Sequence, residues 1–112
     1  MIYYHNPRCS KSRKGLEILQ KSQVDFQIKE YLKDGLTVDE LLTLCSRLGK
    51  RPEEIIRKKE SSFKDLNIPE ALDDKEWCQV ISDHPILLER PILDSGKSAI
   101  IGRPPEELVK IL

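Results

Sequence analysis

A cysteine near the start of the chain has the surroundings that thiol chemistry needs. Cys9 follows the short apolar run Ile2-Tyr3-Tyr4 and precedes a helical pattern that ends near Lys21. A strand that turns into a helix at a cysteine places the sulfur beside unpaired N–H groups and the positive end of the helix dipole. This setting favours the thiolate, which is the nucleophilic form of the side chain. The sequence therefore predicts a nucleophile at position 9.

Several side chains close to Cys9 can influence its reactivity. The cationic residues around it are His5, Arg8, Lys11 and Arg13. His5 has two interpretations, because it is either a charged neighbour that stabilises the thiolate or a hydrogen-bond donor within the turn. Ser12 also has two, because its hydroxyl either donates to the sulfur or caps the helix locally. Both residues are candidates for thiolate activation.

The other two cysteines have a different pattern. Cys45 lies on the apolar stripe of a predicted helix, and Cys78 follows Trp77 in another. Neither has cationic residues placed to ionise it, so core positions are expected. A resolving role for either thiol stays open at this stage. An odd cysteine count without C-x-x-C argues against a disulfide framework and for a reducing, cytoplasmic setting. Two separated histidines make a zinc site improbable.

Three arginines form a second group of candidates for chemistry. Arg57 lies in an apolar and basic segment, whereas Arg90 and Arg103 each precede a proline. The backbone of a residue before proline is held extended, which restricts the direction in which its side chain leaves the chain. Guanidinium groups offer planar forks that match an oxyanion. A thiolate faced by several arginines is suited to the reduction of an oxyanion.

The bulk properties exclude several classes of function. The chain has 112 residues, with 19 basic and 19 acidic side chains that cancel. This balance provides no global electrostatic attraction for nucleic acid or acidic membranes. No apolar run approaches the roughly 20 residues that span a bilayer. The start of the chain also has no pattern of a signal peptide. We therefore expect one cytoplasmic, monomeric domain over residues 1–112 that binds no cofactor and no metal.

The predicted elements follow the order βαβ, helices, ββα. A strand over about Ile2–Tyr4, the helix to Lys21 and a strand over 26–31 make a βαβ unit. The middle, about residues 33–85, is helical, and the capping box at Thr37 begins one of its helices.

The remaining elements complete the fold class. Gly49 ends the helix that begins at Thr37, Pro52 opens a short helix to Lys59, and another helix begins near Asp73. Residues 92–101 predict an antiparallel hairpin, and a last helix begins at 104–105. The predicted fold is α/β and thioredoxin-like, with a helical insertion between the second and third strands.

The motifs together resemble those of the glutaredoxin-coupled arsenate reductase family. They are His5-Asn6-Pro7-x-Cys9-x-x-Ser12-Arg13, Ile55-Ile56-Arg57-Lys58, His84-Pro85-Ile86-Leu87-x-x-Arg90-Pro91-Ile92 and Gly102-Arg103-Pro104. The resemblance covers essentially the whole chain. It implies that Cys9 attacks arsenate and that Arg57, Arg90 and Arg103 bind the oxyanion. It also implies thiolate activation by His5 and Ser12.

The resemblance further implies a source of electrons. Glutathione, as co-substrate, would attack the arseno-cysteine adduct, and glutaredoxin would resolve the mixed disulfide. Arg8, Ser10 and Lys11 replace the small residues found beside the cysteine in better-known members, so the chain resembles a less characterised branch. Two alternatives are a transcription adaptor that binds RNA polymerase and a glutathione-dependent thiol transferase. Ser12 stands where that adaptor usually has its second cysteine, which excludes a disulfide switch within the motif.

Overall fold

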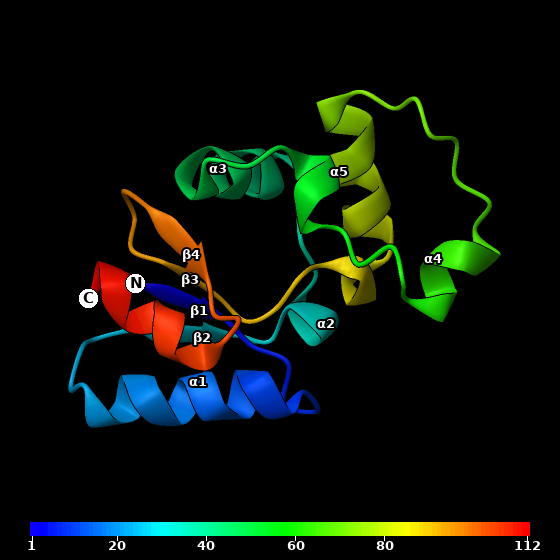
Figure 1. Cartoon of the computed structure of the whole chain (residues 1–112). Coiled ribbons are helices and arrows are strands. Elements are labelled where there is room, and N and C mark those ends of the chain that lie inside the picture. Colours follow the sequence, from blue (N-terminus) through cyan, green and yellow to red (C-terminus); the bar gives the residue numbers. More distant parts are fainter. The chain divides into compact units, whose positions relative to one another are not determined.

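The first apolar run and the helix after it form a βαβ unit, as predicted. In the computed structural model, which describes residues 1–112, the run forms β1 (Ile2–Tyr4). It leads through the cysteine turn into α1 (Ser10–Lys21) and then into β2 (Gln27–Lys29). β2 pairs with β1 in parallel (Figure 1). The cysteine therefore lies at the first junction between strand and helix.

The predicted hairpin supplies the other two strands. β3 (Ile92–Asp94) pairs antiparallel with both β1 and β4 (Ala99–Ile101), so the strand order is β2-β1-β3-β4. At the turn between β3 and β4, the Asp94 carboxylate accepts a hydrogen bond of 2.8 Å from the Gly96 N–H. Gly96 has a φ of 95°, which glycine adopts without steric cost.

The strand register brings three loops to one end of the sheet. Tyr4, the last residue of β1, is paired with Ile92, the first residue of β3. Ile92 is paired in turn with Ile101, the last residue of β4. The segments after Tyr4, before Ile92 and after Ile101 consequently leave the sheet at the same end.

One face of the sheet is covered by α1 and by the last element, η3 (Pro105–Ile111), which pack against each other (Figure 1). Fully buried side chains from β1, α1, β3 and η3 form this core: Tyr3, Leu19, Leu93 and Leu108. Gly15 of α1 makes the close packing possible. A Cβ at Gly15 would lie 2.9 Å from Leu108 and even closer to the hydroxyl of Tyr3.

The helical segment has its own core. Its main helices are α3 (Val38–Leu48) and α5 (Asp74–Asp83), which pack against each other. The shorter elements are η1 (Pro52–Ile55), α4 (Ser61–Asp65) and η2 (Pro85–Leu87). Fully buried side chains hold these elements together: Leu41, Leu44, Ile55, Trp77, Ile81 and Leu87.

The ends of α3 match their prediction. The Thr37 hydroxyl accepts from the Glu40 N–H at 3.1 Å, and the Glu40 carboxylate accepts from the Thr37 N–H at 3.2 Å. Gly49, with a φ of 67°, ends the helix in the left-handed conformation.

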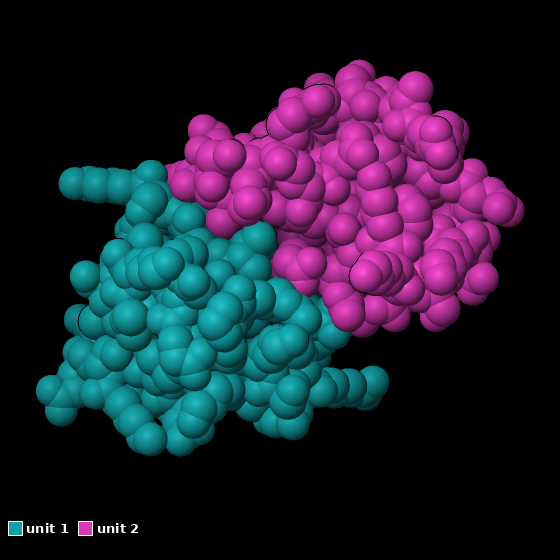
Figure 2. Space-filling view, in the orientation of Figure 1, with its two compact units in different colours: residues 1–34, 90–112 teal, residues 35–89 magenta.

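The chain divides into two units, which Figure 2 shows in different colours. The first comprises Met1–Asp34 and Arg90–Leu112, and the second comprises Gly35–Glu89. The insertion expected over about 33–85 differs by a few residues from the second unit. No helix has the length and apolar character needed to cross a membrane.

Several short elements differ from their prediction. The second strand ends at Lys29, and Tyr31 begins the one-turn helix α2 (Tyr31–Asp34) instead. Ile28 is 47% exposed because β2 is an edge strand. The helix expected over 52–59 is only the single turn η1, and η3 is a 3₁₀ rather than an α-helix.

The close packing at Gly15 predicts that alanine, although a better helix former, destabilises the protein at this position. Gly15→Ala should lower the free energy of unfolding by about 2 kcal/mol, because overpacking outweighs the better helix propensity of alanine. Urea unfolding measures this change. In a Tyr3→Phe background, which lacks the obstructing hydroxyl, the same substitution should cost clearly less. An equal cost in both backgrounds would show that the hydroxyl is not the obstacle.

Candidate active site

Cys9 is the N-cap residue of α1, and its side chain is left free for chemistry. Its backbone is extended, with φ −92° and ψ 124°, and its sulfur makes no capping hydrogen bond. The residue is partly exposed, and the first turn of α1 contains no acidic side chain. The positive end of the helix is therefore not neutralised by an acidic side chain of that turn.

The turn that carries Cys9 is held by Asn6. The Asn6 carbonyl accepts from the Cys9 N–H at 3.0 Å, and the Asn6 side-chain oxygen accepts from the Arg8 N–H at 3.0 Å. The Arg13 guanidinium donates to the Pro7 carbonyl at 2.9 Å, which ties the turn to α1. Asn6 itself is 4% exposed, whereas the bond between Arg13 and Pro7 lies at the surface. Sequence reasoning did not single out Asn6, although asparagine commonly closes such turns.

Ser12 fixes the turn from the side of the helix. Its buried hydroxyl oxygen accepts from the Asn6 N–H at 2.9 Å and lies 2.7 Å from Nδ1 of His5. The hydroxyl has one proton, which it can donate to Nδ1 when the neutral imidazole carries its own proton on Nε2. These partners bind Ser12 to the turn, and its influence on the thiolate stays a prediction.

His5 is held as a buried, neutral imidazole. It is 6% exposed, and burial lowers its pKa below the ordinary value of 6.5. The charge of Glu30 opposes this shift, whereas that of Arg13 adds to it. With Nδ1 accepting from Ser12, the proton of the neutral ring is on Nε2. The interpretation of His5 as a hydrogen-bonding residue of the turn fits this setting, and its activation of Cys9 stays a prediction.

Tyr3 also stabilises the hydrogen-bond network of His5 and Ser12. Its hydroxyl donates to the Ser12 carbonyl at 2.7 Å, and its ring stacks on His5 with centroids 5.6 Å apart. Burial raises the pKa of Tyr3 well above its usual range, so the hydroxyl keeps its proton. Sequence reasoning treated Tyr3 only as part of an apolar strand. The one indication in the sequence that Tyr3 packs closely against α1 is Gly15 on that helix.

Arg90 and Arg103 leave the sheet at the same end as the Cys9 turn. Gly102 N–H donates to the Pro91 carbonyl at 2.8 Å, and the Arg103 guanidinium donates to the Arg90 carbonyl at 3.1 Å. The peptide bonds that join each arginine to its proline are both cis. The structure therefore brings together two of the three predicted arginines.

Two nitrogen atoms of the Arg90 guanidinium lack acceptors. Its Nε and Nη1 atoms are buried and have no hydrogen-bond partner. Buried N–H groups without acceptors are costly, and an anion with several oxygens would satisfy them. These groups can hold an oxyanion at the end of the sheet that the Cys9 turn also leaves.

Arg57 belongs to the second unit. Its N–H donates to the Leu87 carbonyl at 2.8 Å, beside the bridge between Ile56 and Leu88. Its guanidinium pairs with Glu60 at 2.6 Å, and both side chains are about one quarter exposed. The backbone of Arg57 is thus fixed, and its part in binding an oxyanion stays a prediction.

Cys45 and Cys78 are buried partners of each other. They lie on α3 and α5, which pack against each other, and each thiol affects the pKa of the other. Burial raises the pKa of Cys45 to about 12 and also raises that of Cys78. Both therefore stay protonated at neutral pH and are poor nucleophiles. No group of three histidine, cysteine or acidic side chains is placed to hold a metal ion.

The bonds of Ser12 predict a stability cost with a clear control. Ser12→Ala leaves the buried Asn6 N–H without its acceptor, so the free energy of unfolding should fall by about 2 kcal/mol. Ser10→Ala, two residues away on the exposed side, should change it by less than about 0.5 kcal/mol. Urea unfolding compares the two variants. Equal effects would show that the buried hydroxyl is not a structural requirement.

The lowered pKa of His5 predicts a pH dependence of stability. Above pH 6.5 the ring is neutral in both the folded and the unfolded chain. As the pH falls below 6.5, the unfolded chain binds a proton first, so the free energy of unfolding decreases toward the folded-state pKa. His5→Asn, which keeps an acceptor for Ser12, should have a shallower decrease over this window. Urea unfolding across a pH series measures both curves, and parallel curves would contradict the prediction.

Comparison with known proteins agrees with this geometry. The profile of the ArsC family matches residues 4–111. An arsenate reductase from Haemophilus influenzae is 40% identical over 114 aligned residues, which cover 100% of this chain and 98% of that protein. The structure of an arsenate reductase from Vibrio cholerae superimposes with a TM-score of 0.93 at 38% identity, covering 99% of this chain and 96% of that one.

A relative with a different role is also similar. The global transcriptional regulator Spx 2 of Bacillus anthracis is 34% identical, and the match covers 100% of this chain and 86% of the regulator. The fold is thioredoxin-like, as the sequence predicted. From the nearly complete match of the profile and of the relatives, the chain belongs to the ArsC family.

Proposed function

We propose that the protein is an oxidoreductase that reduces arsenate to arsenite through an adduct on Cys9. The observation that carries the proposal is a partly exposed cysteine at the N-cap of α1, at the sheet end where the unpartnered guanidinium of Arg90 also lies. A nucleophile and an oxyanion-binding cation are the two parts that this reaction needs. The names of relatives such as the Haemophilus influenzae protein support this substrate.

The reaction balances with two thiols per arsenate. The Cys9 thiolate attacks arsenic(V) and displaces one oxygen as water, which forms a sulfur–arsenic bond. A second thiol, from glutathione, then attacks the Cys9 sulfur. As the new sulfur–sulfur bond forms, the sulfur–arsenic bond breaks and leaves its electron pair on arsenic, which becomes arsenic(III). Arsenite leaves, and a mixed disulfide between Cys9 and glutathione remains. Glutaredoxin takes up the glutathionyl group and regenerates the Cys9 thiol.

The arginines have the role of holding the oxyanion. Arg90 offers two buried N–H groups without acceptors, and Arg103 is fixed to the Arg90 backbone. Guanidinium groups neutralise the substrate and the charge that develops on its oxygens as sulfur attacks. Arg57 is proposed as the third member, and its ion pair with Glu60 would exchange for one with the substrate.

The thiols of this chain support an external reductant. Cys45 and Cys78 are buried free thiols with raised pKa values, so neither is suited to attack a modified Cys9. A small external thiol such as glutathione, with glutaredoxin, supplies the missing nucleophile. Three free cysteines also fit a reducing, cytoplasmic compartment, and we propose that the protein acts there as a monomer.

Arsenate turnover tests the proposal. With glutathione and glutaredoxin, the native chain should release arsenite, and Cys9→Ser should abolish the reaction because it removes the nucleophile. Arg90→Lys should lower kcat/KM about 10- to 100-fold, because an ammonium lacks the planar fork. Cys78→Ser is the matched control and should retain activity. No turnover by the native chain, or equal turnover by Cys9→Ser, would refute the proposal.

A separate set of assays tests the identity of the reductant. Replacing glutathione and glutaredoxin with thioredoxin and its reductase should leave little turnover. Full activity with thioredoxin would keep the Cys9 chemistry and overturn the assignment of the electron donor. Exchange of glutathione mixed disulfides in the absence of arsenate, without any arsenate reduction, would identify a thiol transferase instead.

A transcription adaptor is the second candidate function. The similarity to the regulator from Bacillus anthracis over the whole chain favours it. Such a protein would bind RNA polymerase by surface contacts and would need no nucleophile. A pull-down with purified polymerase subunits discriminates: retention that survives Cys9→Ser, together with absent arsenate turnover, would establish the adaptor.

A further inference from the structure

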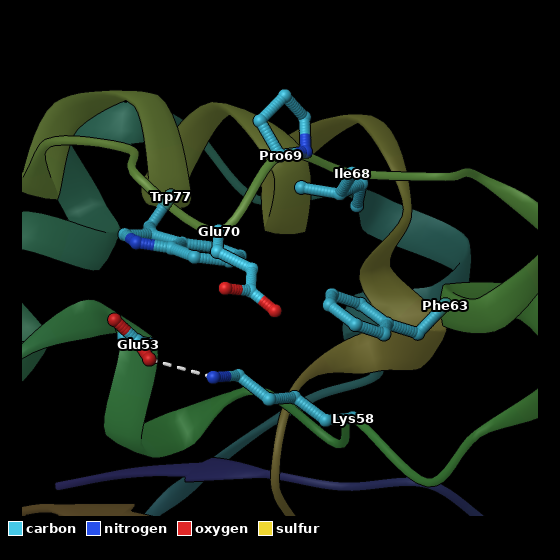
Figure 3. A pocket seen from close by; sticks show the side chains of 7 residues that line it. All are labelled: Glu53, Lys58, Phe63, Ile68, Pro69, Glu70 and Trp77. Carbon is cyan, nitrogen blue, oxygen red and sulfur yellow. Dashed lines mark hydrogen bonds and ion pairs between the residues drawn. The ribbon is translucent and has the colours of Figure 1, made fainter.

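The second unit contains a pocket that has no part in thiol chemistry. It has a volume of about 460 Å³, within the range of small-ligand sites. Its lining combines aromatic, apolar and charged side chains from η1, α4, α5 and the segments between them: Glu53, Lys58, Phe63, Ile68, Pro69, Glu70 and Trp77. Figure 3 shows these side chains arranged around one open space.

The back of the pocket is aromatic and already holds a cation. Trp77 is almost fully buried, and its ring stacks with that of Phe63 at a centroid distance of 6.4 Å and an interplanar angle of 20°. The Lys58 ammonium lies 5.4 Å from the centre of the Trp77 ring. This is the geometry of a cation–π contact, so the pocket is electrostatically suited to positive groups.

One carboxylate beside the pocket has no ion-pair partner. Lys58 pairs with Glu53 at 2.6 Å, whereas Glu70 is exposed and forms no ion pair. In Figure 3 the Glu70 carboxylate points toward the space that Lys58 and Phe63 border. The three charged side chains therefore sum to one negative charge, and Glu70 offers acceptors for another cation.

An incoming cation can displace the Lys58 ammonium from the pocket. Its side chain is 48% exposed and that of Glu53 is 41% exposed, so their ion pair is a surface pair of small net stability. A cation that binds both carboxylates and lies on the aromatic rings would gain more than the lysine contributes. Lys58 thus marks the position that an incoming cation would take.

We propose that this pocket binds an arginine side chain from a partner polypeptide. A guanidinium is planar, stacks on aromatic faces and donates to carboxylates in a fork, so it matches the flat Trp77 and Phe63 walls and the carboxylates of Glu53 and Glu70. The apolar stem of arginine fits beside Ile68. A neutral or acidic side chain would leave Glu70 unpaired. The inference is independent of the arsenate chemistry, because none of the lining residues is assigned a part in that reaction.

The single tryptophan of the chain makes the pocket directly observable. Because Trp77 is the only indole, fluorescence excited selectively at tryptophan and the indole N–H resonance report on this site alone. Titration with N-acetylarginine methylamide should change both signals saturably. The citrulline analogue, which has nearly the same shape and no charge, should bind at least about fivefold more weakly.

Variants test the contribution of each charge. Glu70→Gln should weaken binding of the arginine compound about fivefold, and Lys58→Met should strengthen it about threefold by removing the competitor. Glu106→Gln, an exposed carboxylate of the first unit, is the matched control and should leave binding unchanged. No saturable change with the arginine compound, equal binding of the citrulline analogue, or no effect of Glu70→Gln would overturn the proposal. Cys9→Ser should bind as the native chain does, whatever its effect on arsenate turnover.

Discussion

The placement of the cysteine depends on one buried hydroxyl. Ser12 Oγ accepts from the Asn6 N–H and bonds His5, so a single atom joins the end of β1, the turn and the first turn of α1. The Ser12 carbonyl is held at the same time by Tyr3. Buried polar networks are rigid only when every member is satisfied, since an unpaired group inside the protein is costly. The neutral state of His5 belongs to this network, because a charged imidazole would offer a second proton to a hydroxyl that needs an acceptor.

The sheet register concentrates positive charge where this network ends. Antiparallel pairing of β3 with β1 and β4 brings Arg90 and Arg103 to the end of the sheet that Tyr4 reaches. The buried N–H groups of Arg90 that lack acceptors disfavour folding rather than support it. Such a local conflict is typical of a functional site, where an anionic ligand relieves it. The hydrophobic core beside it, centred on Tyr3 and Leu108, supplies the stability that this arrangement requires.

The sequence was informative where local chemistry decides the structure. The capping box at Thr37, the left-handed Gly49 and the strand–cysteine–helix junction follow from a few neighbouring residues, and each was predicted. Short elements were not, because a one-turn segment such as α2 or η1 has no periodicity to detect, and tertiary contacts select its conformation. The partners of Ser12 were missed for a related reason. A serine near a helix start has many possible acceptors and donors, and only the path of β1 determines that His5 and Asn6 take those places.

The three cysteines differ in burial and therefore in chemical character. Cys45 and Cys78 are surrounded by hydrocarbon and by each other, so their thiolates would lose solvation without gaining a cation, and their protons stay bound. Cys9 is partly exposed at the N-terminus of α1, where no acidic side chain of the first turn opposes the helix dipole. The helical unit therefore contributes no competing nucleophile. Its chemically distinctive feature is instead the aromatic and acidic pocket at Trp77, which we propose binds a cation, whereas the end of the sheet near Cys9 presents N–H groups of Arg90 that lack acceptors. The two proposed sites would take ligands of opposite sign, so neither ligand would compete for the other's position.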